Sequence, residues 1–564
     1  MKFSSRHLVS AALLALVTGC GDGTSPGTGT NVDQIVIILQ HPLGDPAVLA
    51  GETLQLSATV YDSDGTPISD ATVTWLSADE ATAAVSSTGL VSGFVPGFVQ
   101  IRARAGNKAD TVALMVLERA ASLAPLPTVI GIVPGGQTDV ITGFRNAAGA
   151  PLEPFGRTVD WASSNPSVAS FSYGGIPAGA TRGTVIAQVP GSATITVTSP
   201  EATASIPVDV SLLTFTSIGT AYRTSCGLTN TGRAYCWGVN FGHQLANPIV
   251  NGSATPLRVE GVESFASITP GGSETCGIAT GGAAYCWGDN SFGQLGNGTS
   301  EVGNGISTPT PVVGGLHFST LSAGEVSVCG LTSSGNPYCW GGGYDGELGN
   351  GGTANSSVPV LVSGGLTLTS ISLFSRHACG IAADGSAYCW GNNIDGQLGD
   401  NSTTNRSAPV AVTGTLSFTA ISTGIRHTCG ISGSQAYCWG DNSFGEMGSS
   451  GTGSTTPVAL SGGIQFSSVS AGYTHSCGLT SAGVAYCWGL NDVGQLGDGS
   501  NSDSTSPVPV SGGYTFSSIK AGDRYTCGLS VEPVLYCWGG SDNEGATGSS
   551  TIGSTVPVRV TGQP

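Results

Sequence analysis

The strongest constraint on the fold is a unit of about 50 residues that repeats seven times between residues 213 and 564. Each unit reads F-x-S-I, then H-x-C-G-L, a turn, A-Y-C-W-G-x-N-x-x-G-Q-L-G, a polar loop and P-V-x-V. Repeats of this period are typical of solenoids, propellers and arrays. Each unit offers four short strands bounded by turn residues, which is the content of one propeller blade. The sequence therefore predicts a seven-bladed β-propeller over residues 213–564.

The first and last units depart from the pattern and are expected to flank the seam of the ring. The first reads WGVNFGHQLA, one residue short before its glycine, and the last reads WGGSDNEGATG, one residue long. Terminal repeats are commonly irregular. If each blade combined the P-V-x-V of one unit with the strands of the next, the last copy, residues 557–560, would complete the first blade. Such a join would hide the free edges of the sheets.

Cysteine occurs twice in every unit, and seven pairs together with Cys20 account for all 15 cysteines. In HACGIAADGSAYCWG, Cys379 and Cys389 fall opposite one another across a hairpin turn, at a separation that a disulfide spans. An exported protein can form such bonds. The predicted disulfides are Cys226–Cys236, Cys276–Cys286, Cys329–Cys339, Cys379–Cys389, Cys429–Cys438, Cys477–Cys487 and Cys527–Cys537.

Zinc binding and free thiols are the alternatives for these cysteines. Zinc sites favour C-x2-C or C-x4-C pairs that converge with two further ligands, and this chain contains no such pair. Histidine stands two residues before the first cysteine only at His377, His427 and His475. A metal shell could therefore not be a systematic feature of the repeat, and the disulfide is the preferred interpretation.

Two cysteine-free regions precede the repeats, at residues 34–118 and 119–212. Each carries one tryptophan in an expected strand, Trp75 or Trp161, followed by a polar turn and short alternating strands. This spacing suits a small β-sandwich whose tryptophan fills the space between the sheets. The stretch YDSDGT is expected to be a hairpin turn, because it lacks the remaining ligands of a calcium loop. The fold class predicted for the whole chain is all-β.

The N-terminus has the build of an export signal. Lys2 and Arg6 precede an apolar run of about eleven residues, which is too short for a transmembrane helix. The run ends in VTGC, which resembles a bacterial lipobox and implies cleavage before Cys20 and a lipid on its sulfur. We expect residues 1–20 to be a lipoprotein signal peptide and residues 21–33 to be a flexible tether. The alternative is an ordinary secretory signal with an incidental cysteine.

Composition narrows the function. The net charge is −18, and lysine occurs only at Lys2, Lys108 and Lys520, so nucleic-acid binding is not expected. The glycine-rich matches GGGYDG and GTSPG lie inside a blade and in the tether, where neither can serve as a nucleotide loop or a nucleophile elbow. Acidic loop residues such as Asp289, Asp441 and Asp492 are expected to form a solvated rim. We predict no enzymatic activity, no cofactor and no metal.

Variation within the repeat suggests a binding surface. Just before the loop glycine, the units carry a mixed aromatic and acidic set of side chains. These candidate binding-rim residues are Phe241, Phe292, Asp345, Asp395, Phe444, Val493 and Glu544. If they face outward, they form a surface of the kind that binds protein. The alternative is that the aromatic side chains fold back onto their own blades.

The repeat closely resembles that of the regulator of chromosome condensation family, a seven-bladed propeller. The resemblance rests on Y-x-W-G and G-Q-L-G, as at Tyr285, Trp287, Gly288 and residues 293–296, and covers residues 213–564. The cysteines are a departure from the eukaryotic repeat. Residues 34–118 and 119–212 resemble bacterial immunoglobulin-like domains of group 2, through W-x-S and a G-x-A-x-I type of ending.

The favoured function is a surface-tethered extracytoplasmic binding protein whose propeller recognises a protein or a glycan, with the immunoglobulin-like domains as spacers. Localisation is expected at the cell envelope through the lipid alone, and Gly21 after Cys20 favours the outer membrane.

The family resemblance implies guanine-nucleotide exchange as one alternative, although an acidic, exported chain fits it poorly. Bacterial relatives of the propeller include a secreted inhibitor of β-lactamases. A structural component of the envelope or matrix is the other alternative.

Overall fold

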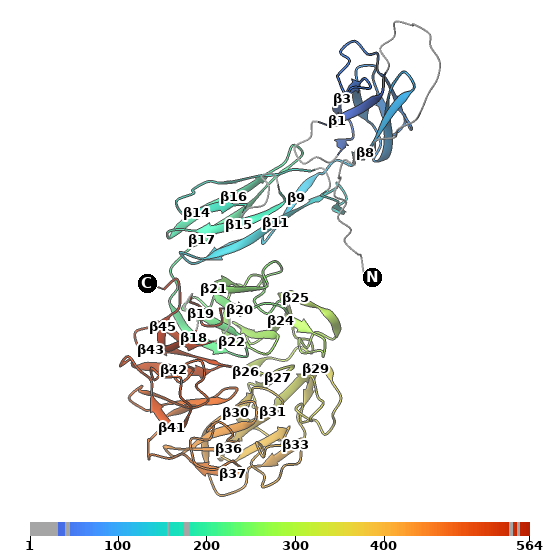
Figure 1. Ribbon diagram of the computed structural model, residues 1–564. Helices are drawn as coiled ribbons and strands as arrows, with labels where there is room; N and C mark the ends of the chain where they lie inside the picture. Colours follow the sequence, from blue (N-terminus) through green and yellow to red (C-terminus); the bar gives the residue numbers. More distant parts are fainter. Residues whose placement is uncertain are drawn as a thin grey trace. The chain divides into compact units, whose positions relative to one another are not determined.

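The computed structural model describes residues 32–39, 46–154, 157–173, 180–540, 545–549 and 553–563. The chain divides into two compact units, residues 1–119 and 120–564, and the regular structure of both is β (Figure 1). None of the described residues belongs to a helix of the length and apolarity that crossing a membrane requires. The expected signal peptide, Cys20 and Glu544 lie outside the described residues.

The first unit contains two four-stranded sheets. One sheet has the order β1-β3-β6-β5, with β1 (Gln34–Leu39), β3 (Thr53–Tyr61), β6 (Leu90–Gly93) and β5 (Ala83–Val85). The other has the order β2-β8-β7-β4, with β2 (Ala47–Leu49), β8 (Lys108–Leu117), β7 (Gly97–Ala105) and β4 (Thr74–Ser77). Trp75 packs against both apolar clusters of this unit, one around Leu56 and one around Ile35, which is the role predicted for it.

A second sandwich begins the second unit. One of its sheets holds β13 (Asp160–Ser163), β16 (Gly191–Thr198), β17 (Thr203–Val210) and β10 (Ile130–Ile132). The facing sheet holds β12 (Pro151–Leu152), β11 (Gln137–Arg145), β15 (Arg182–Ala187), β14 (Ala169–Ser172) and β9 (Ser122–Leu126). Trp161 is buried in this core, stacks on Phe171 at 5.1 Å and donates its indole N–H to the Ala180 carbonyl at 3.1 Å. The Arg157 guanidinium forms a buried ion pair with Glu201.

Within the described residues the repeats form seven antiparallel blades of four strands each, here called blades 1 to 7 in chain order (Figure 1). Six are separate sheets, and blade 1 is part of a larger one. The inner strands are β18 (Phe215–Thr220), β22 (Phe265–Pro270), β26 (Phe318–Ala323), β30 (Leu368–Leu373), β34 (Phe418–Thr423), β38 (Ser468–Ala471) and β42 (Phe516–Ala521). The second strands are β19 (Thr224–Thr229), β23 (Glu274–Ala279), β27 (Ser327–Thr332), β31 (His377–Ala382), β35 (His427–Ser432), β39 (His475–Leu479) and β43 (Tyr525–Ser530). The third strands are β20 (Ala234–Val239), β24 (Ala284–Asn290), β28 (Pro337–Gly341), β32 (Ala387–Gly391), β36 (Gln435–Asp441), β40 (Ala485–Gly489) and β44 (Leu535–Gly539). The outer strands are β21 (Gly252–Arg258), β25 (Glu301–Pro311), β29 (Ser356–Leu361), β33 (Arg406–Ala411), β37 (Gly453–Ala459), β41 (Ser504–Pro509) and β45 (Ser554–Arg559).

Each blade is built from the strands of a single unit. The outer strand β45 pairs with β44 of its own unit, and β21 likewise pairs with β20. The strand exchange considered for the seam is therefore wrong. The ring closes instead through side chains and loops: Tyr525 Oη donates to the Thr224 carbonyl at 2.9 Å, and the Leu213 N–H donates to the Gly562 carbonyl at 2.8 Å.

The tryptophan and the G-Q-L-G element of the repeat act together, one in each of two neighbouring blades. Every repeat tryptophan is fully buried, and its indole N–H donates to a backbone carbonyl of the preceding blade at 2.8–3.1 Å. The pairs are Trp237–Ala546, Trp287–Gln244, Trp340–Gln294, Trp390–Glu347, Trp439–Gln397, Trp488–Glu446 and Trp538–Gln495. The bond from Trp237 to Ala546 joins blade 1 to blade 7, so the series runs around the whole ring. An unpaired buried N–H would cost about 1–3 kcal/mol at each junction.

The last glycine of G-Q-L-G is required by the same contact. Gly296 has φ +63°, and a Cβ there would lie 2.8 Å from the Trp340 indole nitrogen. Blade 1 has Ala246 at this place, in the same left-handed conformation with φ 57°. Only glycine adopts this conformation at no steric cost, so Ala246 is a strained member of the series.

All seven predicted cysteine pairs lie directly opposite one another in the second and third strands, at disulfide distance. Their Cα atoms are 4.0–4.1 Å apart. In the shorter hairpin of blade 5, Cys429 still faces Cys438. Each pair is buried in an apolar cluster that its blade shares with the next, as Cys276 and Cys286 are with Trp340.

The three histidines beside these cysteines bond to the next blade and not to sulfur. Thr428 Oγ1 donates to the Gln397 carbonyl at 2.8 Å, so its oxygen accepts the bond of 2.9 Å from His377 Nε2. His427 bonds Ser476 in the same way, and His475 bonds Thr526. This arrangement fixes the Nε2–H tautomer, and among the residues that the structure describes each buried Nδ1 has no hydrogen-bond partner. Burial lowers the pKa of His377 and of His475 to about 3 and that of His427 to about 4.

The second sandwich is continuous with blade 1. Ile132 of β10 pairs with Leu257 of β21, which joins the two into one eight-stranded sheet. Val133, the next residue, is fully buried in an apolar cluster with Trp237 of blade 1 and Val560 of blade 7. The sandwich therefore contributes a side chain to the core that closes the ring.

Candidate interaction face

The loops that follow the inner strands and those that follow the third strands leave the blades at the same edge, because alternate turns of an up-and-down sheet lie at the same end. We call this edge the loop face. The candidate binding-rim residues lie in the loops after the third strands. The hairpins between second and third strands lie at the opposite edge.

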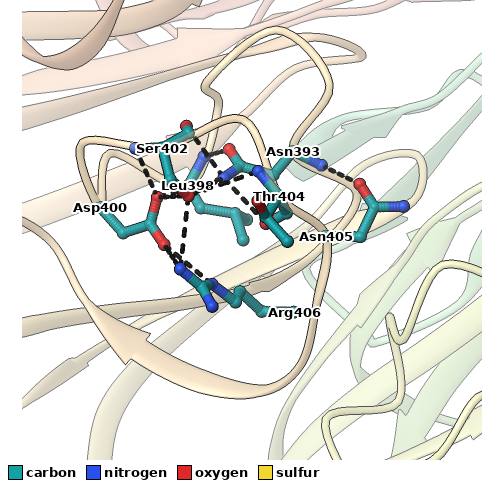
Figure 2. A network of polar contacts seen from close by, with 7 residues as sticks. All are labelled: Asn393, Leu398, Asp400, Ser402, Thr404, Asn405 and Arg406. Carbon is teal, nitrogen blue, oxygen red and sulfur yellow. Dashed lines mark hydrogen bonds and ion pairs between the residues drawn. The ribbon is translucent and has the colours of Figure 1, made fainter.

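In blades 1, 2, 4, 5 and 6 the loop after the third strand is fixed by a buried asparagine, as Figure 2 shows for Asn393 in blade 4. Blade 3 has Gly343 at this position. Asn393 Nδ2 lies 3.1 Å from the acceptor oxygens of Asp400, Ser402 and Thr404. Its Oδ1 accepts the Leu398 N–H at 2.9 Å, at the far end of the same turn. One side chain thus joins both ends of the loop, which makes the loop a preformed support.

Charged groups complete the network in Figure 2. Arg406 lies 2.9 Å from the Asp400 carboxylate. Desolvation opposes the ionisation of Asp400, but hydrogen bonds from Ser402, Arg406 and Asn393 outweigh it and lower the pKa of this carboxyl. The carboxylate is therefore engaged within its own loop.

The acidic rim residues are paired with arginines of the next blade. Arg376 of blade 4 lies 3.1 Å from Glu325 and 3.7 Å from Asp345 of blade 3. Arg426 of blade 5 lies 3.7 Å from Asp395 of blade 4. Arg524 contacts Asp492 in the same manner. Desolvation raises the pKa of Asp395, although Arg426 opposes this. These carboxylates are therefore paired with arginines, whereas Asp289 and Asp441 bond to serines of their own loops.

The alignment of the first unit on its glycine is wrong. The Gly242 N–H donates to Gln244 Oε1, as the Phe292 N–H does to Gln294 Oε1, so Gly242 occupies the rim position and Phe241 precedes it. The first unit is not short, because His243 replaces the loop glycine with a φ of 67°. Aligning the units on their asparagine would have given this register.

Apolar side chains nevertheless gather on the loop face. Phe241 is 71% exposed, and Phe444 is 42% exposed. Phe292 is half-buried because it packs edge-on against Tyr344 of blade 3 at 5.7 Å, and not onto its own blade. Tyr344 and Ile394, which sequence reasoning did not select, are 58% and 56% exposed. Val493 is half-buried and Glu544 lies outside the described residues.

We call Phe241, Phe292, Tyr344, Ile394 and Phe444 the apolar arc, because they come from the successive blades 1 to 5. Exposed aromatic residues on a rigid support bind other molecules at little cost in conformational entropy. Among the residues that the structure describes, no group of three or more His, Cys, Asp or Glu could hold a metal ion.

Sequence comparison supports both parts of the architecture. The Regulator of chromosome condensation (RCC1) repeat matches residues 281–330, 334–381, 384–431 and 482–529, and a second form of the repeat matches 267–294, 369–397 and 466–495. The Bacterial Ig-like domain (group 2) matches residues 42–116. The chain therefore carries RCC1 repeats preceded by a bacterial Ig-like domain, as predicted for residues 213–564 and 34–118. The same family resemblance for residues 119–212 stays a prediction.

Solved structures agree with this fold. Human WBSCR16 is 20% identical with a TM-score of 0.52, over 57% of this chain and 89% of that protein. Yeast RCC1 (Prp20), in its complex with Kap60, is also 20% identical with a TM-score of 0.52, over 62% of this chain and 85% of that one. At this identity the likeness shows the propeller fold alone.

One curated relative is Ice-binding protein 1 of Shewanella frigidimarina, which is 29% identical over 177 residues. The match covers 31% of this chain and 19% of that protein. The chain therefore spans less than a fifth of that relative.

Proposed function

We propose that this protein is an exported binding protein whose propeller recognises a protein partner through the apolar arc on its loop face. An RCC1-repeat propeller joined to a bacterial Ig-like domain suggests a role in protein interaction. The observation that carries the proposal is the position of four exposed apolar side chains, Phe241, Tyr344, Ile394 and Phe444, on the loop face. Buried asparagines fix three of these four loops, whereas the Tyr344 loop is tied by the exposed Asn355. A glycan is the alternative ligand, since exposed aromatic rings also stack on sugars.

Binding, and not catalysis, is the proposed mode of action. The loop-face carboxylates that could act as acids or bases, such as Asp345 and Asp395, lie beside arginines of the next blade. Those pairs favour specificity and steering of a charged partner around an apolar centre. Guanine-nucleotide exchange has no residue-level support beyond the fold.

The experiment compares two surface variants. The immobilised, oxidised protein would first be used to isolate a partner from envelope extracts. Substituting Phe241, Tyr344, Ile394 and Phe444 by serine should then abolish saturable binding of that partner. Loss of one or two aromatic anchors costs about 2–4 kcal/mol, or roughly 30- to 1,000-fold in Kd. The matched control replaces the exposed Val484 and Val531, which lie in hairpins of the opposite face.

The two outcomes separate the possible roles. Equal binding by the arc variant and the control would reject the arc as the binding surface. The absence of any saturable partner in protein and glycan fractions would favour a structural role in the envelope.

We also propose attachment to the envelope, in the outer membrane, through a lipid on Cys20. The seven cysteine pairs at disulfide distance support export, because such bonds persist in oxidising compartments. Substituting Cys20 by serine should move the protein from the membrane fraction to the soluble fraction. Retention of the variant on the membrane would reject the anchor.

A further inference from the structure

The inner strands surround a cavity of about 320 Å³ at the centre of the ring, here called the central channel. Residues of all seven blades line it, and one equivalent position in each inner strand faces the first cysteine of its blade. The residues at this position are Gly219, Thr269, Ser322, Ser372, Ser422, Ser470 and Lys520. Five hydroxyls, one glycine and one ammonium therefore share a single level of the channel.

The hydroxyls connect successive blades. Ser322 Oγ accepts the Leu373 N–H at 2.8 Å and donates to the Leu373 carbonyl at 3.1 Å. Ser422 Oγ accepts the Ala471 N–H, and Ser470 Oγ accepts the Ala521 N–H, both at 3.0 Å. A hydroxyl that accepts one bond can still donate another. For Ser422 and Ser470 the described residues show only the accepted bond, so both O–H groups are available to a ligand.

Lys520 interrupts this series in blade 7. No hydrogen bond or ion pair to its ammonium is found among the residues that the structure describes, and the described lining of the channel contains no carboxylate. The Lys520 side chain is exposed to the open cavity. Protein surrounds that cavity, and the resulting desolvation lowers the pKa of the ammonium. A charged group in such surroundings is stabilised by an anion that shares the cavity.

Three aromatic side chains meet at one end of the channel. Tyr222, Phe374 and Tyr473 follow the inner strands of blades 1, 4 and 6 at the loop face. Tyr222 stacks on Phe374 at 5.9 Å and meets Tyr473 edge-on at 5.6 Å. Contacts across the ring between such distant blades cover this end, so a ligand would approach from the opposite face. The level of Lys520, near the end of its strand, lies close to this cover.

We propose that the central channel binds a small oxyanion, a carboxylate or a phosphate, between the Lys520 ammonium and the hydroxyls of Ser422 and Ser470. The three groups come from the successive blades 5, 6 and 7, and together they offer a positive charge and two hydroxyl donors, the combination that oxyanions accept. The size of the cavity admits the anion with water or with a short organic chain. This site lies apart from the apolar arc and does not depend on the proposed function.

The first test uses the lysine content of the chain. Beyond the expected signal peptide, Lys108 and Lys520 are the only lysines. Acetic anhydride would be applied to the oxidised full chain near neutral pH, with inorganic phosphate or citrate as the probe. Mass spectrometry would measure the acetylation of each lysine. An anion at about ten times its Kd should slow acetylation of Lys520 roughly tenfold and leave the exposed Lys108 unchanged. A response to only one probe identifies phosphate or carboxylate as the preferred class.

The proposal would be overturned if the anions slowed acetylation of Lys108 and Lys520 equally, or if they slowed neither. A second measurement uses K520S, because serine stands at this position in four other blades and should be accepted by the fold. The anion should raise the unfolding temperature of the parent and of the matched control K108S, but not that of K520S. A rise retained in K520S would reject the site even if the acetylation result were positive.

Discussion

The buried histidines should make the propeller sensitive to acid, and the size of the effect follows from one residue. The Nε2–H of His427 is bonded to Ser476, and its buried Nδ1 has no hydrogen-bond partner in the described part of the chain. A second proton would therefore place a charge where no described group accepts it. Its pKa is about 4 in the folded state against an ordinary value of 6.5. At about 1.4 kcal/mol per pH unit, the unfolded state gains about 3 kcal/mol over this interval.

The sign of the effect is set by which state binds the proton. Between pH 6.5 and about 4 the unfolded chain protonates His427 and the folded chain does not, so stability is full above pH 6.5 and is lost as the pH falls. Buried glutamates act in the opposite direction. Burial raises the pKa of Glu446 to about 7, and it raises those of Glu274 and Glu347 as well. These groups gain stability as the pH falls, so the total profile of the parent should be flatter than the histidines alone would give.

A comparison of variants isolates the histidine. H427Q keeps an N–H donor for Ser476 but cannot take up a proton, and H317Q is the control because His317 is exposed. Urea unfolding would be followed by tryptophan fluorescence, since seven of the nine tryptophans belong to the blades. The free energy of unfolding of the parent minus that of H427Q should fall by about 3 kcal/mol between pH 7 and pH 4. A difference that is independent of pH would refute the reasoning.

Three further substitutions test single features of the fold. A246G should raise the free energy of unfolding by about 1 kcal/mol in urea unfolding, because it removes a left-handed alanine without loss of contacts; a loss of stability would show that the methyl group is needed against Trp287. The double variant C379S/C389S should unfold with a free energy about 2.5–3 kcal/mol below that of the oxidised parent, since it opens a loop with a sequence separation of 10; an unchanged free energy of unfolding would mean that this bond does not form. E201Q removes the carboxylate that pairs with the buried Arg157 and should cost about 3–5 kcal/mol in thermal unfolding of the second sandwich; a loss below about 1 kcal/mol would show that water or another group replaces the pair.

The features that the sequence predicted are those set by local spacing. Cys379 and Cys389 face each other because both lie at equal distance from one hairpin turn. Four strands in each unit follow from turn residues at fixed intervals, and Trp75 and Trp161 fill their sandwiches as their positions in alternating strands required. Interactions within about a dozen residues are visible in a linear pattern, so these elements could be found without a structure.

The features that the sequence did not predict depend on two units at once. The register of Phe241 was misplaced because a glycine was used as the reference, whereas the contact shared by five blades belongs to the position of Asn240, whose Oδ1 accepts the Leu245 N–H. The pairing of Asp345 with Arg376 joins side chains 31 positions apart in two blades. Closure of the ring could not be deduced either, since Trp237 and Ala546 meet only when the whole series of blades is complete.

Comparison among blades separates the structural positions from the candidate functional ones. Every blade keeps the tryptophan and the cysteine pair, because each junction needs the same contacts. The residue that faces the first cysteine from the inner strand varies among the blades, and the structure explains one variation. Gly219 has no hydroxyl, and Pro270 of the next blade has no N–H for such a hydroxyl to bind. No such explanation applies to Lys520. Its next-blade neighbour Thr220 retains an N–H, so a serine would have served the ring as it does in blades 3 to 6. A substitution that the ring does not require is best explained by a ligand, and this argument supports an anion site in the central channel.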